Sequence, residues 1–83
     1  MILLIIDDDP TWSRFLSANF PTTTDPGDPW QLAVVSALQM RDPERVPAAI
    51  WQRGAIVATN SPASLEGAEA FRLGALRYFA KES

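Results

Sequence analysis

The sequence predicts an α/β fold: an open parallel sheet of about four strands, with about three helices packed against it. Three observations lead to this class. Short apolar runs at residues 2–6, 31–38, 55–59 and 76–80 have the length of strands, and runs of this kind are typical of strands buried on both faces of a sheet. Helical patterns lie between them. The regular alternation of the two kinds of segment indicates a mostly parallel sheet.

The first helix is expected over residues 10–20. Asp9 supplies an N-cap and Pro10 a first helical position, the places that these residue types prefer at the start of a helix. Trp12, Phe15, Leu16 and Ala18 or Asn19 recur near helical spacing and predict its buried side.

Residues 21–30 are the one clear linker, rich in proline and threonine. Three prolines and a glycine over residues 21–29 exclude a helix, and Thr22 to Thr24 could form at most a stub of strand. The linker is therefore expected to separate the first strand and helix from the rest of a single domain that spans residues 1–83.

The second strand is expected within residues 31–38. Asp42 and Pro43 then form a cap-plus-proline helix start, which Pro47 interrupts because a proline inside a helix removes a backbone hydrogen bond. A short helix over residues 47–53, ended by Gly54, is the alternative.

Residues 55–59 predict the third strand, and residues 76–80 the last one. Between them Ser61 is expected to cap a helix that begins at Pro62 and ends at Gly74. The buried side of this helix is expected to comprise Leu65, Ala68, Phe71 or Arg72, and Leu73.

Composition excludes several classes of function. The net charge is −3, which argues against a nucleic-acid partner because phosphate binding needs clustered basic residues. The chain has no cysteine and no histidine, so disulfides, thiolate chemistry and imidazole catalysis are excluded. No apolar run approaches the ~20 residues of a membrane span, and we expect a cytoplasmic protein without membrane contact.

Four segments resemble parts of the response-regulator receiver family: ILLIIDDDP, QLAVVSAL, IVATN and GALRYFAKES. The resemblance implies a flavodoxin-like sheet with strand order 2-1-3-4-5. It also implies that Asp7 and Asp8 are the family's acidic pair, that Thr59 is its switch threonine, and that Lys81 is its invariant lysine. These residues would meet at the carboxyl edge of the sheet.

The family's phosphoacceptor aspartate aligns with Ser36, and residues 31–40 contain no aspartate. A serine hydroxyl is a poor nucleophile without a base, and a magnesium ion would keep only Asp7 and Asp8 as carboxylate ligands. We therefore expect Ser36, Thr59 and Lys81 to be a vestigial site. In this site we expect Lys81 to pair directly with Asp7 and Asp8, and we expect no cofactor. The alternative is that Asp7 and Asp8 bind Mg²⁺.

The architecture also departs from the family. The linker replaces the second strand and second helix, and the sequence stops where the family's fifth helix begins. The first strand then lies at or near a sheet edge, and one apolar face is left uncovered. We expect a homodimer or an obligate protein partner. The interface candidates are Ile2, Leu4, Ile6 and Trp30.

The sequence thus favours a non-phosphorylatable pseudo-receiver, an interaction module that dimerises or acts as an adaptor in bacterial signalling or transcriptional regulation. Enzymatic turnover is not expected, since no nucleophile–base pair can be assembled. The alternative is a Mg²⁺- or phosphate-responsive switch that uses the residual acidic pocket. A weaker alternative is a minimised or engineered receiver fragment.

Overall fold

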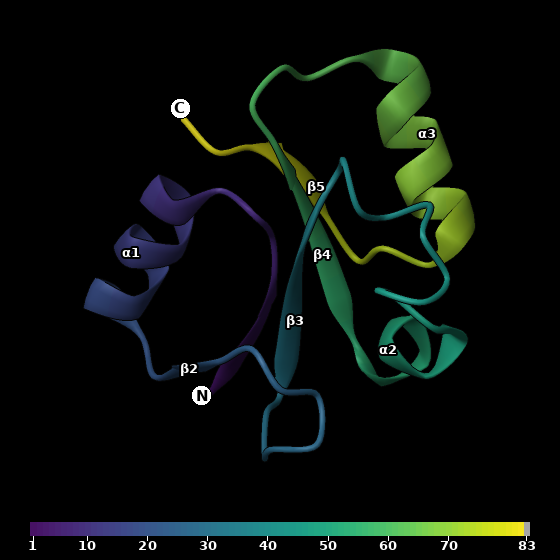
Figure 1. Ribbon diagram of the computed structural model, residues 1–83. Helices are drawn as coiled ribbons and strands as arrows, with labels where there is room; N and C mark the ends of the chain where they lie inside the picture. Colours follow the sequence, from purple (N-terminus) through teal and green to yellow (C-terminus); the bar gives the residue numbers. More distant parts are fainter. Residues whose placement is uncertain (83) are drawn as a thin grey trace.

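A computed structural model describes residues 1–82 and contains a five-stranded parallel sheet in the order β2-β1-β3-β4-β5, with helices on both faces (Figure 1). The α/β class predicted from the sequence is confirmed. The strands are β1 (Leu3–Ile6), β2 (Thr22–Thr23), β3 (Leu32–Ser36), β4 (Ala55–Thr59) and β5 (Tyr78–Ala80). The helices are α1 (Pro10–Asn19), α2 (Ala48–Arg53) and α3 (Ser64–Leu73).

Helix α1 begins as its sequence predicts. The Asp9 carboxylate accepts hydrogen bonds from the backbone N–H groups of Thr11 and Trp12, and Pro10 occupies the first turn. These contacts use donors that the first turn of a helix otherwise leaves unpaired. The aspartate-rich turn after β1 is therefore ordered by the backbone of α1.

Two predicted helix starts are wrong. At Asp42 the chain forms a turn, in which the Val46 N–H donates to the Asp42 carbonyl. Helix α2 begins only after Pro47, so the alternative of a short helix over residues 47–53 is confirmed. Ser61 does not cap α3, which begins at Ser64 with Ala63 in the N-cap position and no side-chain cap hydrogen bond; the Ser61 N–H instead donates to the Thr59 hydroxyl in the turn after β4. The predicted ends of these two helices are confirmed. Gly54 ends α2 and Gly74 ends α3, with φ of 137° and 121°, in the region that glycine adopts without strain.

The linker contains β2, whose two residues pair with Leu3 and Leu4 of β1. The outer edge of β1 is therefore covered over half of its length, and Ile5 and Ile6 have a paired neighbour only in β3. Among the described residues no helix lies between β2 and β3.

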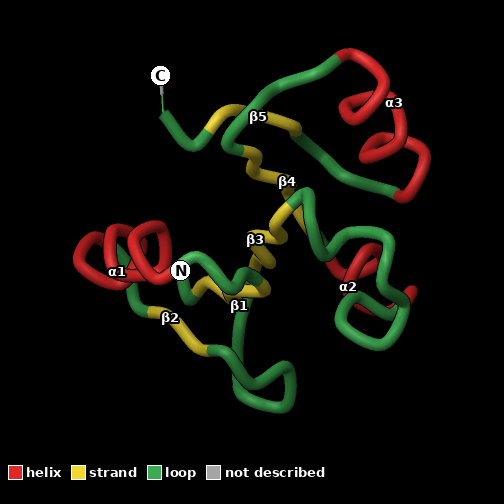
Figure 2. The backbone as a smooth tube through the Cα atoms, turned by 45° about the horizontal axis from the view of Figure 1, so that its top comes forward, coloured by secondary structure: helices red, strands yellow, loops and turns green. Residues whose placement is uncertain are grey.

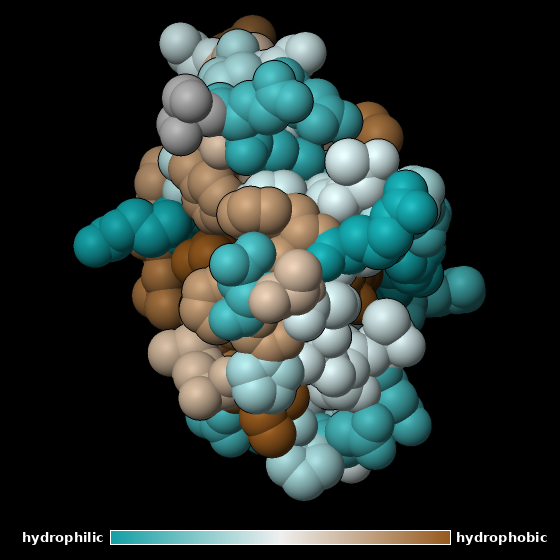
Figure 3. Space-filling model, turned by 90° about the vertical axis from the view of Figure 1, so that its left-hand side faces the viewer, coloured by the Kyte–Doolittle hydropathy of each residue, from teal (hydrophilic) through white to brown (hydrophobic). Residues whose placement is uncertain are grey.

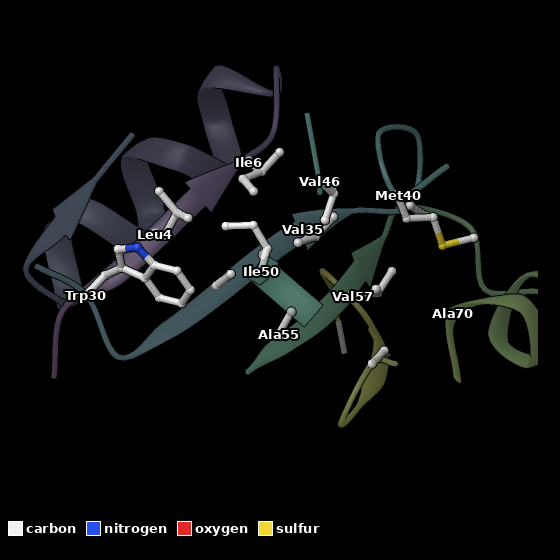
Figure 4. Packing of buried hydrophobic residues seen from close by; sticks show 13 residues of the cluster. Leu4, Ile6, Trp30, Val35, Met40, Val46, Ile50, Ala55, Val57 and Ala70 are labelled. Atoms are coloured by element: carbon white, nitrogen blue, oxygen red, sulfur yellow. The ribbon is translucent and has the colours of Figure 1, made fainter. Parts of the chain in front are cut away.

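One face of the sheet packs against α2 and α3. Its core contains Val35 and Val57 from the central strands, with Ile50 from α2 and Ala70 from α3 (Figure 4). These residues are at most 5% exposed. This face is the larger of the two apolar layers.

Trp30 belongs to this core, so its prediction as an interface residue is wrong. It is 2% exposed, and its indole Nε1 donates to the Pro26 carbonyl. The Arg53 guanidinium lies 3.9 Å from the ring centroid, a distance that permits cation–π attraction. The proline-rich loop folds back under α2 and carries the indole into the interior.

The other residues named as interface candidates are also mostly internal. Leu4 and Ile6 are 0% and 7% exposed, because their side chains lie between β1 and the α2–α3 layer. Ile2 is partly buried against the same cluster. An interface through these residues is not supported.

The predicted buried side of α3 is wrong as well. Gly67 and Ala70 face the core, whereas Leu65 and Phe71 are 85% and 55% exposed. The cause is the Tyr78 ring, which lies so close to α3 that a Cβ atom at position 67 would meet it at 2.9 Å. Small residues must therefore face the sheet there.

The opposite face carries α1 alone, as Figure 2 shows. Trp12 and Leu16 of α1 pack on Leu3 and Ile5 of β1 and reach Ala58 of β4. The other residues predicted for the buried side of α1 are exposed: Phe15, Ala18 and Asn19. A single helix covers only part of a five-stranded sheet, so Ile56 and Phe79 remain partly exposed.

Candidate functional site

The carboxyl ends of the parallel strands meet at one edge of the sheet and form a hollow of about 220 Å³. Asp7 follows β1, Ser36 ends β3, and Lys81 follows β5. Thr59, at the end of β4, lines an adjoining hollow that shares Ser36 and Lys81. The topology thus brings together the residues that the sequence singled out.

A buried ion pair lies at the centre of this edge. The Lys81 ammonium is 2.8 Å from Asp7 Oδ2, with the two side chains 5% and 3% exposed. The backbone positions the lysine, because the Lys81 N–H donates to the Thr59 carbonyl at 2.8 Å and so extends the β4–β5 pairing by one residue.

The second carboxylate on Lys81 is that of Asp9, at 3.2 Å, and not that of Asp8. The expectation that the lysine faces both Asp7 and Asp8 is therefore half wrong. The reason is the turn after β1: the Asp9 N–H donates to Asp7 Oδ1. This bond places Asp7 and Asp9 on one side of the turn and directs Asp8 outward.

Asp9 has two structural roles. Its carboxylate caps α1 and also contacts the Lys81 ammonium. The hydrogen bond from the Trp12 N–H, followed by that from Lys81, lowers the pKa of Asp9 from its ordinary value. The sequence indicated the cap but gave no sign of the ion pair, because Lys81 lies 72 positions away along the chain.

Asp8 is bound from the outside. Its carboxylate accepts hydrogen bonds from Gln39 Nε2 at 3.2 Å and from the Arg45 guanidinium at 3.2 and 3.4 Å. Both partners lie in the irregular segment between β3 and α2. Neither partner was predicted from the sequence, because residues 37–47 form turns rather than the helix start expected at Asp42.

Ser36 and Thr59 are internal. They are 3% and 6% exposed. The Ser36 hydroxyl accepts the Leu38 N–H at 3.1 Å, and the Thr59 hydroxyl accepts the Ser61 N–H at 3.3 Å. Each hydroxyl stabilises the turn that follows its own strand.

A second hydrogen-bond network lies beside the hollow that Thr59 lines, since Glu66 lines the same hollow. The Tyr78 hydroxyl donates to Glu66 and accepts the Ala63 N–H. Loss of solvent around the phenol raises the pKa of Tyr78. The network fixes the start of α3 against β5.

Two further features of residues 1–82 bear on the site. No group of three or more acidic side chains is arranged to hold a metal ion in this part of the chain. None of its three helices combines the length and hydropathy that crossing a membrane requires.

The strand order and the polar edge together define a receiver-like, flavodoxin-like fold. The chain is similar in structure to HP1043, an orphan response regulator of H. pylori, whose crystal structure superimposes with a TM-score of 0.63 at 20% sequence identity. The match covers 100% of this chain and 84% of HP1043. No protein-family model and no curated protein matches the sequence.

Proposed function

We propose that this chain is a pseudo-receiver: a cytoplasmic interaction module of bacterial signalling or transcriptional control that acts by contact and not by phosphoryl transfer or turnover. One observation carries the proposal. Where a receiver would hold its phosphorylated aspartate, Ser36 lies buried, and the neighbouring Asp7 is neutralised by Lys81 at 2.8 Å.

The chemistry of Ser36 supports this proposal. Its hydroxyl is 3% exposed and already accepts a backbone hydrogen bond. A serine needs a neighbouring base to act as a nucleophile, and the chain has no histidine. Attack on a phosphodonor at this position is therefore disfavoured by the burial of Ser36, by the lack of a histidine base and by the pairing of the neighbouring Asp7 carboxylate with Lys81.

The uncovered sheet face supports a role in contact. Phe15 and Phe20 of the α1 region are 55% and 45% exposed, beside the partly exposed Ile56 and Phe79. Contiguous apolar surface of this kind is typical of a protein interface. The occupant of that face is either a second copy of the chain or another protein.

A second candidate function is a switch that responds to Mg²⁺ or phosphate. It is favoured by the hollow at the sheet edge, which is lined by Asp7, Asp8 and Lys81. In this alternative Mg²⁺ would displace the Lys81 ammonium from Asp7, and a phosphoryl group or its mimic would then bind the ammonium.

Titration with Mg²⁺, with and without beryllofluoride, distinguishes the two functions. Trp12 reports on the site, because its ring centroid lies 5.9 Å from the Lys81 ammonium. The pseudo-receiver proposal expects no saturable change in tryptophan fluorescence. A saturable change that is lost in Asp7→Asn would overturn it and establish the switch.

A further inference from the structure

The face of the sheet that carries α1 contains an apolar groove of about 280 Å³. The groove runs between α1 and the β4–β5 side of the sheet. In Figure 3, which looks at this side of the molecule, brown and tan side chains gather on the surface and long polar side chains project around them. The groove is lined by Met1, Leu3, Trp12, Phe15, Leu16, Phe20, Leu32, Val34, Ile56 and Phe79.

The geometry of the sheet favours a helix as the occupant. Parallel sheets are normally covered by helices on both faces, and α2 and α3 already cover the other face. The free strip lies alongside α1, so a second helix parallel or antiparallel to α1 would bury Ile56 and Phe79 together. An amphipathic helix fits such a groove through an apolar stripe repeated at three- and four-residue spacing.

Outside the Lys81–Asp9 pair, two of the charges that border the groove are basic, Arg14 and Arg77, and one is acidic, Glu82, which lines an adjoining hollow with Trp12 and Phe15. Arg14 lies on the exposed side of α1, next to Phe15, and Arg77 lies two residues before Phe79, on the same face by strand alternation. Within residues 1–82 neither arginine has a carboxylate within ion-pair distance. Elsewhere on the molecule Arg41 binds Glu69 and Arg45 binds Asp8, whereas Arg72 of α3, like Arg14 and Arg77, is in no ion pair within residues 1–82.

We infer that the groove binds an acidic amphipathic helix of another protein, with the apolar stripe on Ile56 and Phe79 and carboxylates on Arg14 and Arg77. This inference rests on the proposed contact function and specifies its partner. Complementary charge at the rim of an interface sets the choice of partner more than the affinity. We therefore expect the acidic face of the partner helix to distinguish it from amphipathic helices whose polar face is neutral or basic.

A second copy of the chain is a poor match for the same groove. Helices α1 and α2 contain no acidic residue, so α1 of a second copy would bring a second Arg14 toward the basic rim. Helix α3 has two glutamates, but Glu66 accepts the Tyr78 hydroxyl and Glu69 pairs with Arg41. Like charges at an interface are a repulsive element that disfavours the wrong partner.

The test uses two synthetic helical peptides that share one leucine stripe and differ only in polar face, one of glutamate and one of lysine. Binding to the full chain is measured by fluorescence anisotropy at low salt. We expect the glutamate peptide to bind at least about tenfold more tightly than the lysine peptide, and the preference to reverse in the double variant Arg14→Glu/Arg77→Glu. Arg72 lies on the exposed side of α3, away from the groove. Arg72→Glu therefore serves as the charge control and should leave the preference for the glutamate peptide unchanged.

A matched pair of phenylalanines locates the binding site. Phe15 and Phe71 are both 55% exposed, on opposite layers of the molecule. Phe15→Asp should abolish binding of the glutamate peptide, whereas Phe71→Asp should not. Equal binding of the two peptides, or equal loss in the two aspartate variants, would overturn the inference.

Sedimentation velocity of the chain alone separates failure of this inference from failure of the proposed function. A dimer that Phe15→Asp dissociates would overturn the acidic-helix inference and leave the contact function standing. A monomer that binds neither peptide would also overturn the inference, while the Mg²⁺ and beryllofluoride titration would still decide the proposed function.

Discussion

The Lys81 ammonium lies 2.8 Å from the Asp7 carboxylate, and both side chains are almost fully buried. The two residues follow strands β5 and β1, which are separated in the sheet by β3 and β4. The ion pair therefore spans the carboxyl edge of the central strands. Opposite charges removed from water must be paired, so each residue constrains the position of the other.

Removal of one partner should destabilise the fold. Lys81→Met leaves the Asp7 carboxylate buried and unpaired, a change that costs about 3–5 kcal/mol in other proteins. The double variant Lys81→Met/Asp7→Asn should recover much of this loss. Urea denaturation of the four species measures the coupling. Additive effects of the two substitutions would contradict the pairing.

Trp30 should behave as a core residue. Its indole is 2% exposed and packs with Leu4 and Ile50 in one cluster, so Trp30→Ala should lower the free energy of unfolding by about 3–5 kcal/mol. Because the loss is internal to one molecule, it should not depend on protein concentration. Denaturation curves at two concentrations check this. A variant of unchanged stability with altered self-association would restore the interface assignment.

Gly67→Ala should destabilise the protein, although alanine is favoured over glycine in helices by about 1 kcal/mol. The new Cβ would lie 2.9 Å from Tyr78 Cδ2, and overpacking of this kind costs about 1–3 kcal/mol. The Tyr78 ring cannot easily move, because its hydroxyl is held at Ala63 and Glu66. In a Tyr78→Ala background the same substitution should become neutral or stabilising. Thermal unfolding of the four species gives the sign.

Asp9 should contribute to stability in a pH-dependent way. Its pKa is lowered in the folded state from the ordinary value of 3.8, so its contribution is present above that value and is lost as pH falls through the folded pKa. Asp9→Asn keeps a good N-cap and removes the charge. The stability difference between wild type and Asp9→Asn should therefore shrink as pH falls below about 4. A difference that grows toward acid would contradict the sign.

Glu69→Gln should show the same trend for a different reason. The Arg41 guanidinium lowers the pKa of Glu69 from its ordinary value of 4.5, so this contribution is also lost toward acid. Acid titration of the free energy of unfolding measures it. Arg41→Met should remove the pH dependence that Glu69 contributes.

Local chemistry made much of the fold predictable. Strand β4 matches residues 55–59, and Pro10, Gly54 and Gly74 mark helix ends where their backbone preferences require. The resemblance to receivers implied that Asp7, Ser36, Thr59 and Lys81 meet at the carboxyl edge, where parallel strands end together. These features depend on a few neighbouring residues each.

The remaining features depend on contacts between distant parts of the chain. Trp30 is internal because Arg53 and Pro26 hold it there, and nothing in the proline-rich loop itself indicates that. Leu65 is exposed because Tyr78 occupies the space beside α3. Apolar periodicity gave the wrong side of this helix, since the close approach of an aromatic ring requires glycine and alanine instead.

Mass spectrometry after incubation with acetyl phosphate and Mg²⁺ tests the central claim most directly. With Ser36 buried and Asp7 bound to Lys81, we expect the intact mass to remain unchanged, while a receiver domain with an intact aspartate serves as the positive control. Addition of one phosphoryl group, whether hydroxylamine-sensitive on Asp7 or Asp8 or hydroxylamine-resistant on Ser36, would contradict the account.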